Sequence, residues 1–263
     1  MYFQQIESIL QKNYPFAWKS LSFQPYLEFG EKSSNKWYST LGISLFPSKE
    51  VIISAKKQNI HFIFTYFPLF FRPVKQISEF SIKDIKLLAL SDISLYVIGN
   101  LIQFCKGGIL DMMIRMSSLD LIKNISEQKS EESIPIGRLC RPLTNSTDFS
   151  YILQNLQKNF GAKNVHLWGS TKSKVERIGI FEVDSLLKIG FKVLFEENIE
   201  VIVTSDLSLN WIWKLVNLGI TVISIDSLTY LTHGLENFSK QLSVLMPRMK
   251  IEYIPYSLQR LVI

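Results

Sequence analysis

Four side chains in the last third of the chain are of the types that bind divalent metal ions: Asp206, Asp226, His233 and Glu236. Zinc and similar metals take neutral imidazoles and carboxylates as ligands, and a bound metal can activate water for hydrolysis. Asp206 and Asp226 each follow an apolar run, and Glu236 comes three residues after His233. A histidine at a helix start is more often a cap or a surface group. We therefore predict no metal site and keep these four residues as the alternative.

Hydroxyl side chains form a second group of candidates. Thr65 and Thr204 each end an apolar run, and Ser227 lies shortly after a third run. Such hydroxyls could hydrogen-bond a ligand, or they could satisfy backbone amides where strands end. Cys105 has no histidine in its sequence neighbourhood to activate a thiol, so we predict that it is a small buried apolar side chain. No catalytic residue is predicted.

The elements that must position these residues are organised around residues 59–71. Residues 60–64 are rich in aromatic and β-branched side chains, which is typical of a strand buried on both faces of a parallel sheet. Pro68 cannot donate to a strand ladder, so the strand ends before it. Strand and helix patterns alternate on both sides of this strand, which predicts right-handed crossovers. The predicted elements are helices at 2–14, 48–57 and 81–90 and strands at 40–46, 60–65 and 93–98.

The second half of the chain repeats this order. IHFIFTYF and IEVIVTSD both read as strands that end in threonine, and each is followed by a helix and another strand. The sequence therefore predicts an α/β fold with two similar lobes, in which mainly parallel sheets are flanked by helices. A cleft at the strand carboxyl ends is expected between Thr65, Gly99, Thr204 and Asp226. The later elements are helices at 149–160, 186–194, 209–216 and 235–245 and strands at 165–168, 177–181, 200–203, 220–225 and 251–254.

A charged, serine-rich segment divides the two predicted lobes. Residues 123–135 read KNISEQKSEESIP and contain little apolar content, so they are expected to be a linker or a loop. The first lobe would then be residues 1–122 and the second residues 136–263. The N-terminal helix could complete the second lobe.

Composition bounds the class of protein. The 263 residues are 47% hydrophobic, enough for a sizeable core, and the net charge of +6 is spread over small separate groups. This distribution argues against nucleic-acid binding. The two cysteines lie far apart without metal-site spacing, which fits a reducing, cytoplasmic setting. No signal peptide and no transmembrane segment are expected. Three aromatic side chains near the start are expected at exposed positions that suit an interface: Tyr2, Phe3 and Trp37.

Five segments, taken in order, resemble one known family. They are TYFPLFF from Thr65, LYVIGNLIQFCKGGILD from Leu95, IGRL from Ile136, VIVTSD from Val201 and VISIDSLTYLTHGLENF from Val222. Their order and spacing resemble the Nif-three-like proteins, also called GTP cyclohydrolase I type-2-like or dinuclear-metal hexameric proteins. The resemblance covers most of the chain. It implies a toroidal homohexamer and a site for two divalent metal ions.

The resemblance also implies which positions would bind the metals. A Thr-His-His-Pro turn, a His-Thr-Asn-x-Asp turn before a Gly-Gly pair, and a closing Gly-His-x-x-x-Glu element supply the family's ligands. A shift of two residues in the last element would place His233 at the glutamate position. The Thr-Gly-Asp or Thr-Gly-Glu turn survives as Thr204, Ser205 and Asp206. On the preferred alignment the six ligand positions hold Tyr66, Phe67, Gly99, Gln103, Ser227 and Leu231.

These replacements lead to the predicted function. Aromatic, amide and aliphatic side chains do not replace imidazole or carboxylate ligands, so the site should not bind metal. We expect a non-catalytic, metal-free homologue that acts as a binding or assembly protein and forms a homo-oligomer. Its cleft would be either collapsed core or a pocket for an uncharged or aromatic ligand. The alternative is a hydrolase of a nucleotide-like substrate with two divalent ions (Zn, Fe or Mn) on relocated ligands. The candidate pocket residues are Thr65, Tyr66, Phe67, Gly99, Gln103, Thr204, Asp206, Ser227 and Leu231.

Overall fold

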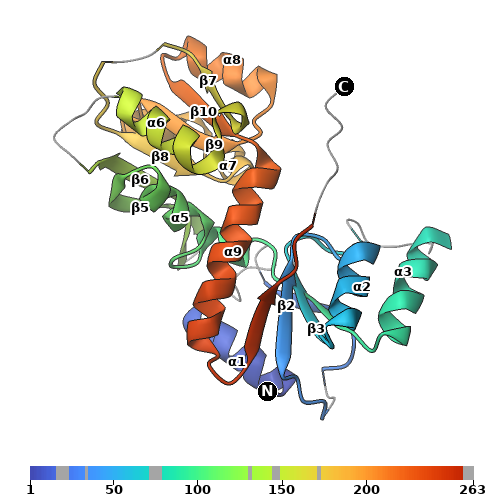
Figure 1. Ribbon diagram of the computed structural model, residues 1–263. Helices are drawn as coiled ribbons and strands as arrows, with labels where there is room; N and C mark the ends of the chain where they lie inside the picture. Colours follow the sequence, from blue (N-terminus) through green and yellow to red (C-terminus); the bar gives the residue numbers. More distant parts are fainter. Residues whose placement is uncertain are drawn as a thin grey trace. The chain divides into compact units, whose positions relative to one another are not determined.

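The computed structural model divides the chain into two compact units, each with its own sheet and flanking helices (Figure 1). Unit 1 is Met1–Cys105 with Leu235–Ile263, and unit 2 is Lys106–Gly234. Each unit is described by itself. The structure describes residues 1–15, 24–32, 35–70, 79–129, 132–143, 149–170 and 173–256.

Unit 1 contains a five-stranded sheet in the order β1-β4-β3-β2-β11. Strands β4, β3, β2 and β11 run parallel, and β1 is antiparallel to β4 at one edge. The helix α9 starts in unit 2 and ends in unit 1. The elements of unit 1 are α1 (Phe3–Asn13), β1 (Tyr26–Phe29), β2 (Thr40–Ser44), α2 (Lys49–Lys57), β3 (Phe62–Thr65), α3 (Glu79–Leu90), β4 (Ser94–Val97), α4 (Leu101–Phe104), α9 (Ser227–Leu245) and β11 (Lys250–Tyr253).

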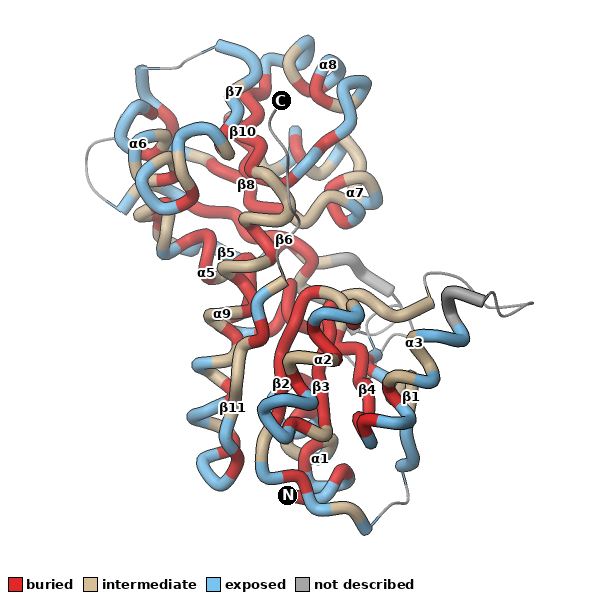
Figure 2. The backbone as a smooth tube through the Cα atoms, turned by 45° about the vertical axis from the view of Figure 1, so that its right-hand side comes forward, coloured by how far each residue is buried: buried red, intermediate tan, exposed pale blue. Residues whose placement is uncertain are grey.

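The alternation of side chains along β3 explains how its two faces are covered. Ile63 points into a cluster formed with residues of α2 and α3, such as Val51 and Leu88. Phe62, one residue earlier, contacts Phe3 of α1 with the ring centroids 5.9 Å apart. Both faces are therefore buried, as Figure 2 shows by the red colour of β2 and β3. The predicted central strand is confirmed.

Unit 2 contains a six-stranded mixed sheet in the order β5-β6-β8-β9-β10-β7. Only β8, β9 and β10 are parallel, and the remaining pairs are antiparallel. The elements of unit 2 before α9 are α5 (Ile109–Met116), β5 (Leu119–Lys129), β6 (Glu132–Pro142), α6 (Phe149–Phe160), the short 3-10 helix η2 (Ala162–Asn164), β7 (Val165–Trp168), β8 (Ile178–Phe181), α7 (Val183–Glu196), β9 (Val201–Ser205), α8 (Leu209–Asn217) and β10 (Thr221–Ile225).

The two α/β halves are confirmed, but the mainly parallel arrangement holds only for the sheet of unit 1. Helix α7 is kinked at Gly190, which has φ 68° and ψ 176°. Other residues rarely adopt this conformation, so glycine both weakens the helical pattern and permits the bend. Among the described helices none is long and apolar enough to cross a membrane.

The predicted division of the chain differs from the structure. Residues 123–129 and 132–135, expected in a linker, belong to strands β5 and β6, which pair antiparallel; residues 130 and 131 lie outside the described residues. Ile125 joins the core of unit 2 while Lys123 and Asn124 are exposed, so polar residues next to the buried position hid the strand pattern. Residues 106–122 belong to unit 2, and residues from 235 onward join the N-terminal helix in unit 1.

The structure also differs from the sequence-based prediction at an edge strand, at the start of the last helix and at one aromatic side chain. Residues 26–29 form the edge strand β1 within a stretch that shows no strand pattern in the sequence. The last helix begins at Ser227 rather than Leu235, so Leu231 and His233 lie inside it. Of the three aromatics expected to be exposed, Tyr2 and Trp37 are exposed, whereas Phe3 is 2% exposed and belongs to the core.

Candidate functional site

The candidate site in unit 1 lies at the carboxyl ends of β2 and β3. Ser44 and Thr65 are paired in register at the end of these parallel strands, and both are fully buried. Neither hydroxyl has a hydrogen-bond partner among the described residues. A buried polar group without a partner costs about 1–3 kcal/mol. The strand end therefore carries two unsatisfied hydroxyls side by side.

Tyr66 and Gln103 meet directly beyond this strand end. The backbone N–H of Tyr66 donates to the carbonyl of Ser44 at 3.2 Å, which continues the ladder by one residue. Gly99, with φ +44°, then turns the chain from β4 toward α4, the helix that carries Gln103. Nε2 of Gln103 donates to the Tyr66 hydroxyl at 2.9 Å, and this hydroxyl donates to Oδ1 of Asn100 at 3.4 Å. Tyr66 and Gln103 are both buried, so their hydrogen bond is shielded from solvent.

Phe67 packs into a group of aromatic rings. Its ring stacks on Phe46 with centroids 4.7 Å apart and an interplanar angle of 11°. Tyr256 contacts the same Phe46 ring edge-on at 4.9 Å. These partly buried rings provide an apolar surface at the strand end without any metal-ligand chemistry.

The turn after Phe67 is held by a carboxylate from the edge strand β1. The two carboxylate oxygens of Glu28 accept the backbone N–H groups of Leu69 and Phe70 at 2.7 and 3.1 Å. Burial raises the pKa of Glu28, and the two backbone hydrogen bonds oppose that rise. Glu28 therefore has a structural role in this turn.

The candidates in unit 2 cap backbone groups. Thr204 is buried at the end of β9, and its hydroxyl has no hydrogen-bond partner among the described residues. Oδ2 of the exposed Asp206 accepts the N–H of Ser227 at 3.2 Å. Oδ1 of Asp226 accepts both the N–H and the hydroxyl of Thr229 at 3.0 and 3.1 Å. The two aspartates thus satisfy amides at the start of α9, as helix caps do.

The remaining candidates lie along α9. Leu231 is buried, and the ring of His233 meets Phe160 edge-on with centroids 5.3 Å apart. Glu236 lies on the part of α9 that belongs to unit 1. Gly234 is required for packing, because a Cβ atom there would lie 2.4 Å from Cγ1 of Ile109. His233 therefore lies inside a packed helix, not at the helix start where we expected it.

The described side chains at the positions that the resemblance assigns to metal ligands include neutral ones, such as Tyr66 and Gln103. Among the residues that the structure describes, no group of three or more His, Cys, Asp or Glu side chains is placed to hold a metal ion. At the positions that the resemblance assigns to ligands, Tyr66 and Gln103 offer a phenol and an amide that bond to each other. The cleft expected between Thr65, Gly99, Thr204 and Asp226 would need residues of both units, so it stays a prediction.

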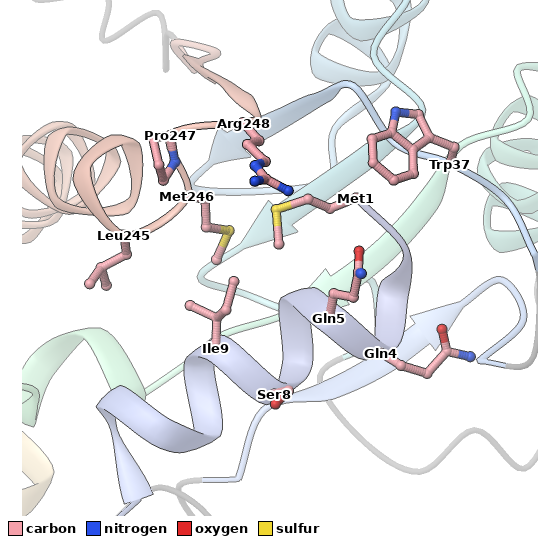
Figure 3. A pocket seen from close by; sticks show the side chains of 10 residues that line it. All are labelled: Met1, Gln4, Gln5, Ser8, Ile9, Trp37, Leu245, Met246, Pro247 and Arg248. Atoms are coloured by element: carbon pink, nitrogen blue, oxygen red, sulfur yellow. The ribbon is translucent and has the colours of Figure 1, made fainter.

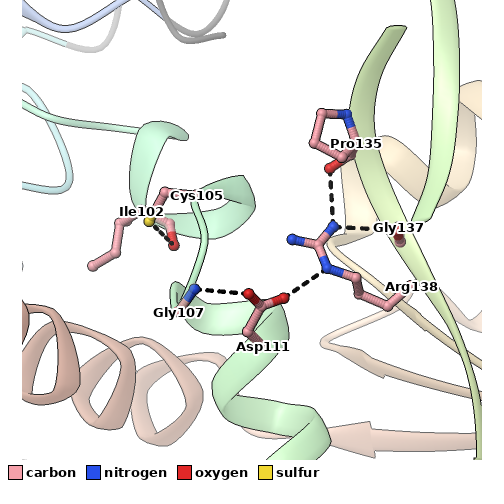
Figure 4. A network of polar contacts seen from close by, with 7 residues as sticks. All are labelled: Ile102, Cys105, Gly107, Asp111, Pro135, Gly137 and Arg138. Carbon is pink, nitrogen blue, oxygen red and sulfur yellow. Dashed lines mark hydrogen bonds and ion pairs between the residues drawn. The ribbon is translucent and has the colours of Figure 1, made fainter. Parts of the chain in front are cut away.

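Sequence reasoning missed a buried ion pair in unit 2 (Figure 4). Nε of Arg138, whose side chain is 3% exposed, donates to Oδ1 of Asp111 at 2.7 Å. The other carboxylate oxygen of Asp111 accepts the N–H of Gly107 at 2.7 Å, and Arg138 also donates to the carbonyls of Pro135 and Gly137. The segments GGILD and IGRL, which carry part of the resemblance, are joined by this pair. Their role in the structure is to position the β5–β6 hairpin on α5.

The two cysteines are free and buried. Sγ of Cys105 donates to the carbonyl of Ile102 at 3.8 Å, which agrees with the predicted apolar role. Burial raises the pKa of the Cys140 thiol to about 12, an effect that the nearby Arg138 opposes. A thiol held in its neutral form is a poor nucleophile.

Solved structures share this fold. Reduced HcgD from Methanocaldococcus jannaschii matches with a TM-score of 0.78 and 22% identity, covering 96% of this chain and 97% of that one. A Bacillus cereus protein related to NIF3 matches with a TM-score of 0.78 and 13% identity, covering 99% and 98%. The architecture of two α/β units with mixed sheets is thus that of a known fold.

The sequence comparisons then define the family. The model of Duf34/NIF3 (NGG1p interacting factor 3) matches residues 1–260, so the chain belongs to this family. A GTP cyclohydrolase 1 type 2 homolog of Methanocaldococcus jannaschii is 34% identical over 86 residues, 33% of this chain and 35% of that protein's length. A homolog of the same name from Clostridium perfringens is 25% identical over 203 residues, 76% of this chain and 75% of that protein.

Proposed function

We propose that this chain is a metal-free, non-catalytic member of the Duf34/NIF3 family that acts as a binding or assembly protein. The hydrogen bond between Gln103 and Tyr66 is the observation that carries the proposal. Both residues stand where the family resemblance places metal ligands, and both are buried in contact with each other. A neutral amide and a phenol bring no negative charge to offset a divalent cation.

The free energy of metal binding indicates how much six replaced ligand positions would matter. Structural zinc sites with four ligands have apparent binding free energies of roughly 10–16 kcal/mol, so each ligand accounts for a few kcal/mol. Six replaced positions exceed what the remaining polar groups could restore. Asp206 and Asp226, the nearest carboxylates in the surviving motifs, cap backbone amides at the start of α9. The strand end in unit 1 is instead suited to contact an uncharged or aromatic partner through Phe46 and Phe67.

Assembly is the second part of the proposal. The family resemblance implies a homohexamer, and we infer that this chain forms a homo-oligomer in a reducing, cytoplasmic setting. The free, buried state of Cys105 and Cys140 supports such a setting. The mass of the native protein, measured by light scattering after gel filtration, tests this part independently of metal content.

Metal analysis tests the loss of the metal centre. The protein is purified without chelators or a histidine tag, incubated with Zn²⁺, Mn²⁺ or Fe²⁺, freed of excess ion by gel filtration and analysed per chain. We expect less than about a tenth of an ion per chain, whereas roughly two ions would contradict the proposal.

A pair of variants identifies the ligands if metal is found. The double variant Asp206→Asn, His233→Gln removes two residues of the alternative ligand set. The double variant Glu176→Gln, His166→Gln likewise removes one carboxylate and one imidazole, from exposed positions outside this set. Loss of bound metal in the first variant alone would support a metal-dependent hydrolase with relocated ligands.

A further inference from the structure

A pocket of about 540 Å³ opens in unit 1 at the edge of the sheet opposite to the strand-end site (Figure 3). Trp37 and Arg248, which line it, come just before the parallel strands β2 and β11 begin. The other lining residues come from α1 and from the end of α9 with the turn that follows it. The volume lies within the range of about 300–1,000 Å³ that is usual for small-molecule sites. The pocket is thus large enough for a ligand and separate from Tyr66 and Gln103.

One side of the pocket is apolar. Figure 3 shows the side chains of Met1, Ile9 and Met246 pointing toward one another. Methionine side chains adapt their shape and make favourable sulfur contacts with aromatic rings. This wall suits a flat aromatic body better than a polar one.

A tryptophan stands at one end of the pocket in a fixed position. Trp37 is 55% exposed although its backbone forms a bridge with Tyr2 and its ring meets the Tyr2 ring edge-on at 5.1 Å. An exposed indole held in place by backbone pairing offers a stacking surface at a small entropy cost. The ring of a ligand can therefore lie between Trp37 and the apolar wall.

A cation without a partner completes the pocket. Within the described part of the chain, Arg248 makes no ion pair and no side-chain hydrogen bond. None of the residues lining the pocket is acidic, and the first turn of α1 carries no acidic side chain. The positive end of the α1 dipole adds to the charge of Arg248. A guanidinium fork in such surroundings matches a carboxylate in two parallel hydrogen bonds.

We propose that this pocket binds a small aromatic carboxylate. The ring would lie against Trp37 and the wall of Met1, Ile9 and Met246, and the carboxylate would accept hydrogen bonds from Arg248. The ligand class follows from one exposed indole, one unpaired arginine and an apolar wall with polarizable sulfur atoms. It does not depend on whether the chain binds metal.

Calorimetric titration with 2-naphthoate tests the proposal, with 2-naphthamide as the neutral ligand of the same shape. Hydrogen bonds to charged groups justify an expected loss of about tenfold or more in affinity when the carboxylate or its partner is removed. Arg248→Gln should therefore weaken naphthoate binding by about tenfold and leave naphthamide binding unchanged. Trp37→Leu should weaken both ligands.

Two controls match these variants. Lys240→Gln removes an exposed cation of unit 1 that does not line the pocket, and Trp213→Leu removes an indole that is 65% exposed on α8. Neither should change the affinity for naphthoate. Circular dichroism of every variant confirms that the fold is kept.

Three results would overturn the proposal. The first is the absence of naphthoate binding at millimolar concentration, and the second is equal affinity for naphthoate and naphthamide. The third is a change of native mass in Arg248→Gln without any naphthoate binding by the parent protein, which would make the pocket an interface between copies of this chain.

Discussion

The carboxyl ends of β3 and β9 share a buried threonine but differ in the residues that follow it. Each strand is buried throughout and ends near a threonine, Thr65 or Thr204, whose hydroxyl has no partner among the described residues. Tyr66 follows β3 and enters a buried hydrogen bond, whereas Asp206 follows β9, is exposed and caps an amide. The backbone frame is thus the same in both units while the chemistry after the threonine differs. The same strand frame therefore supports different side chains at the two strand ends.

The interiors of the two units also differ in the chemistry of their side chains. Unit 1 is built on aromatic contacts around Phe62, such as the stacked ring of Tyr38 at 4.7 Å. Unit 2 has aliphatic strands and a buried ion pair between Arg138 and Asp111. Apolar packing degrades gradually when it is trimmed, but a buried charge that loses its partner is costly. Unit 2 should therefore be the more sensitive to a single polar change.

The largest effect is expected at Asp111. Asp111→Ala removes the carboxylate that accepts hydrogen bonds from Nε of the buried Arg138 and from the N–H of Gly107. Breaking a buried pair in this way lowers the free energy of unfolding by about 3–5 kcal/mol. Urea unfolding followed by circular dichroism measures the loss.

The matched control is the exposed pair of Asp120 and Arg141, whose side chains are 48% and 64% exposed. Asp120→Ala should lower stability by only about 0–1 kcal/mol. If Asp111→Ala and Asp120→Ala cost the same, the Arg138 pair does not stabilise unit 2, and the contrast between the units fails.

The strands and helices that the sequence predicts are those with strong periodic patterns. Ile60–Phe64 and Val201–Val203 identify the central strand of each half because both faces of those strands are apolar. The hairpin of β5 and β6 was not predicted because the exposed Lys123 and Asn124 interrupt the apolar pattern, while the buried Ile125, Ile136 and Leu139 are spread over two strands. Strand β1 was not predicted because a charged residue such as Glu28 is not typical of a strand. Its carboxylate instead caps the turn after Phe67.

The contacts at the candidate strand end could not be predicted from the sequence. Sequence order places Tyr66 and Gln103 at neighbouring strand ends, but it cannot reveal that the amide of one meets the hydroxyl of the other. Helix α9 begins at Ser227, ahead of the expected start at Leu235, and Asp226 caps its first turn. The pocket at Trp37 and Arg248 joins residues more than two hundred positions apart, so no local pattern could indicate it.

A smaller change in the free energy of unfolding is expected from two buried threonines in the neighbouring strands β9 and β10. The sign of the change should differ between them. Thr204→Val removes a buried hydroxyl without a partner and should raise the free energy of unfolding by about 1–2 kcal/mol. Thr221 is equally buried in β10, but its hydroxyl donates to the carbonyl of Ser170 at 2.8 Å. Thr221→Val should therefore lower stability by about 1 kcal/mol. Thr65→Val in unit 1 should behave like Thr204→Val.

Urea midpoints of the three variants give these signs directly. A decrease in stability for both Thr65→Val and Thr204→Val would mean that the two hydroxyls have bound partners in solution. Both strand ends would then hold a small polar ligand, and the two units would be similar in ligand binding as well as in backbone.

The smallest effect is the pH dependence from one partly buried glutamate in each unit. Glu182 accepts the N–H groups of Asp184 and Ser185 at the start of α7, as Glu28 does for the turn after Phe67. Burial raises the pKa of both carboxyls above 4.5, although hydrogen bonds oppose the rise. A raised pKa in the folded state means that the folded protein binds the proton more tightly than the unfolded chain. The resulting stability is present below pH 4.5 and is lost as the pH rises through the raised pKa values.

Urea midpoints measured between pH 4 and pH 7 should therefore decline less steeply in Glu28→Gln and in Glu182→Gln than in the parent protein. Each glutamine keeps one acceptor oxygen, so a constant loss of about 1 kcal/mol leaves the slope as the readout. Glu50 provides a control of opposite sign, because a hydrogen bond from its own backbone N–H lowers its pKa in the first turn of α2. Its contribution is lost as the pH falls, so Glu50→Gln should make the decline steeper. If all three variants shift the slope alike, burial does not govern the carboxyls of Glu28 and Glu182, and their caps act as ordinary surface caps.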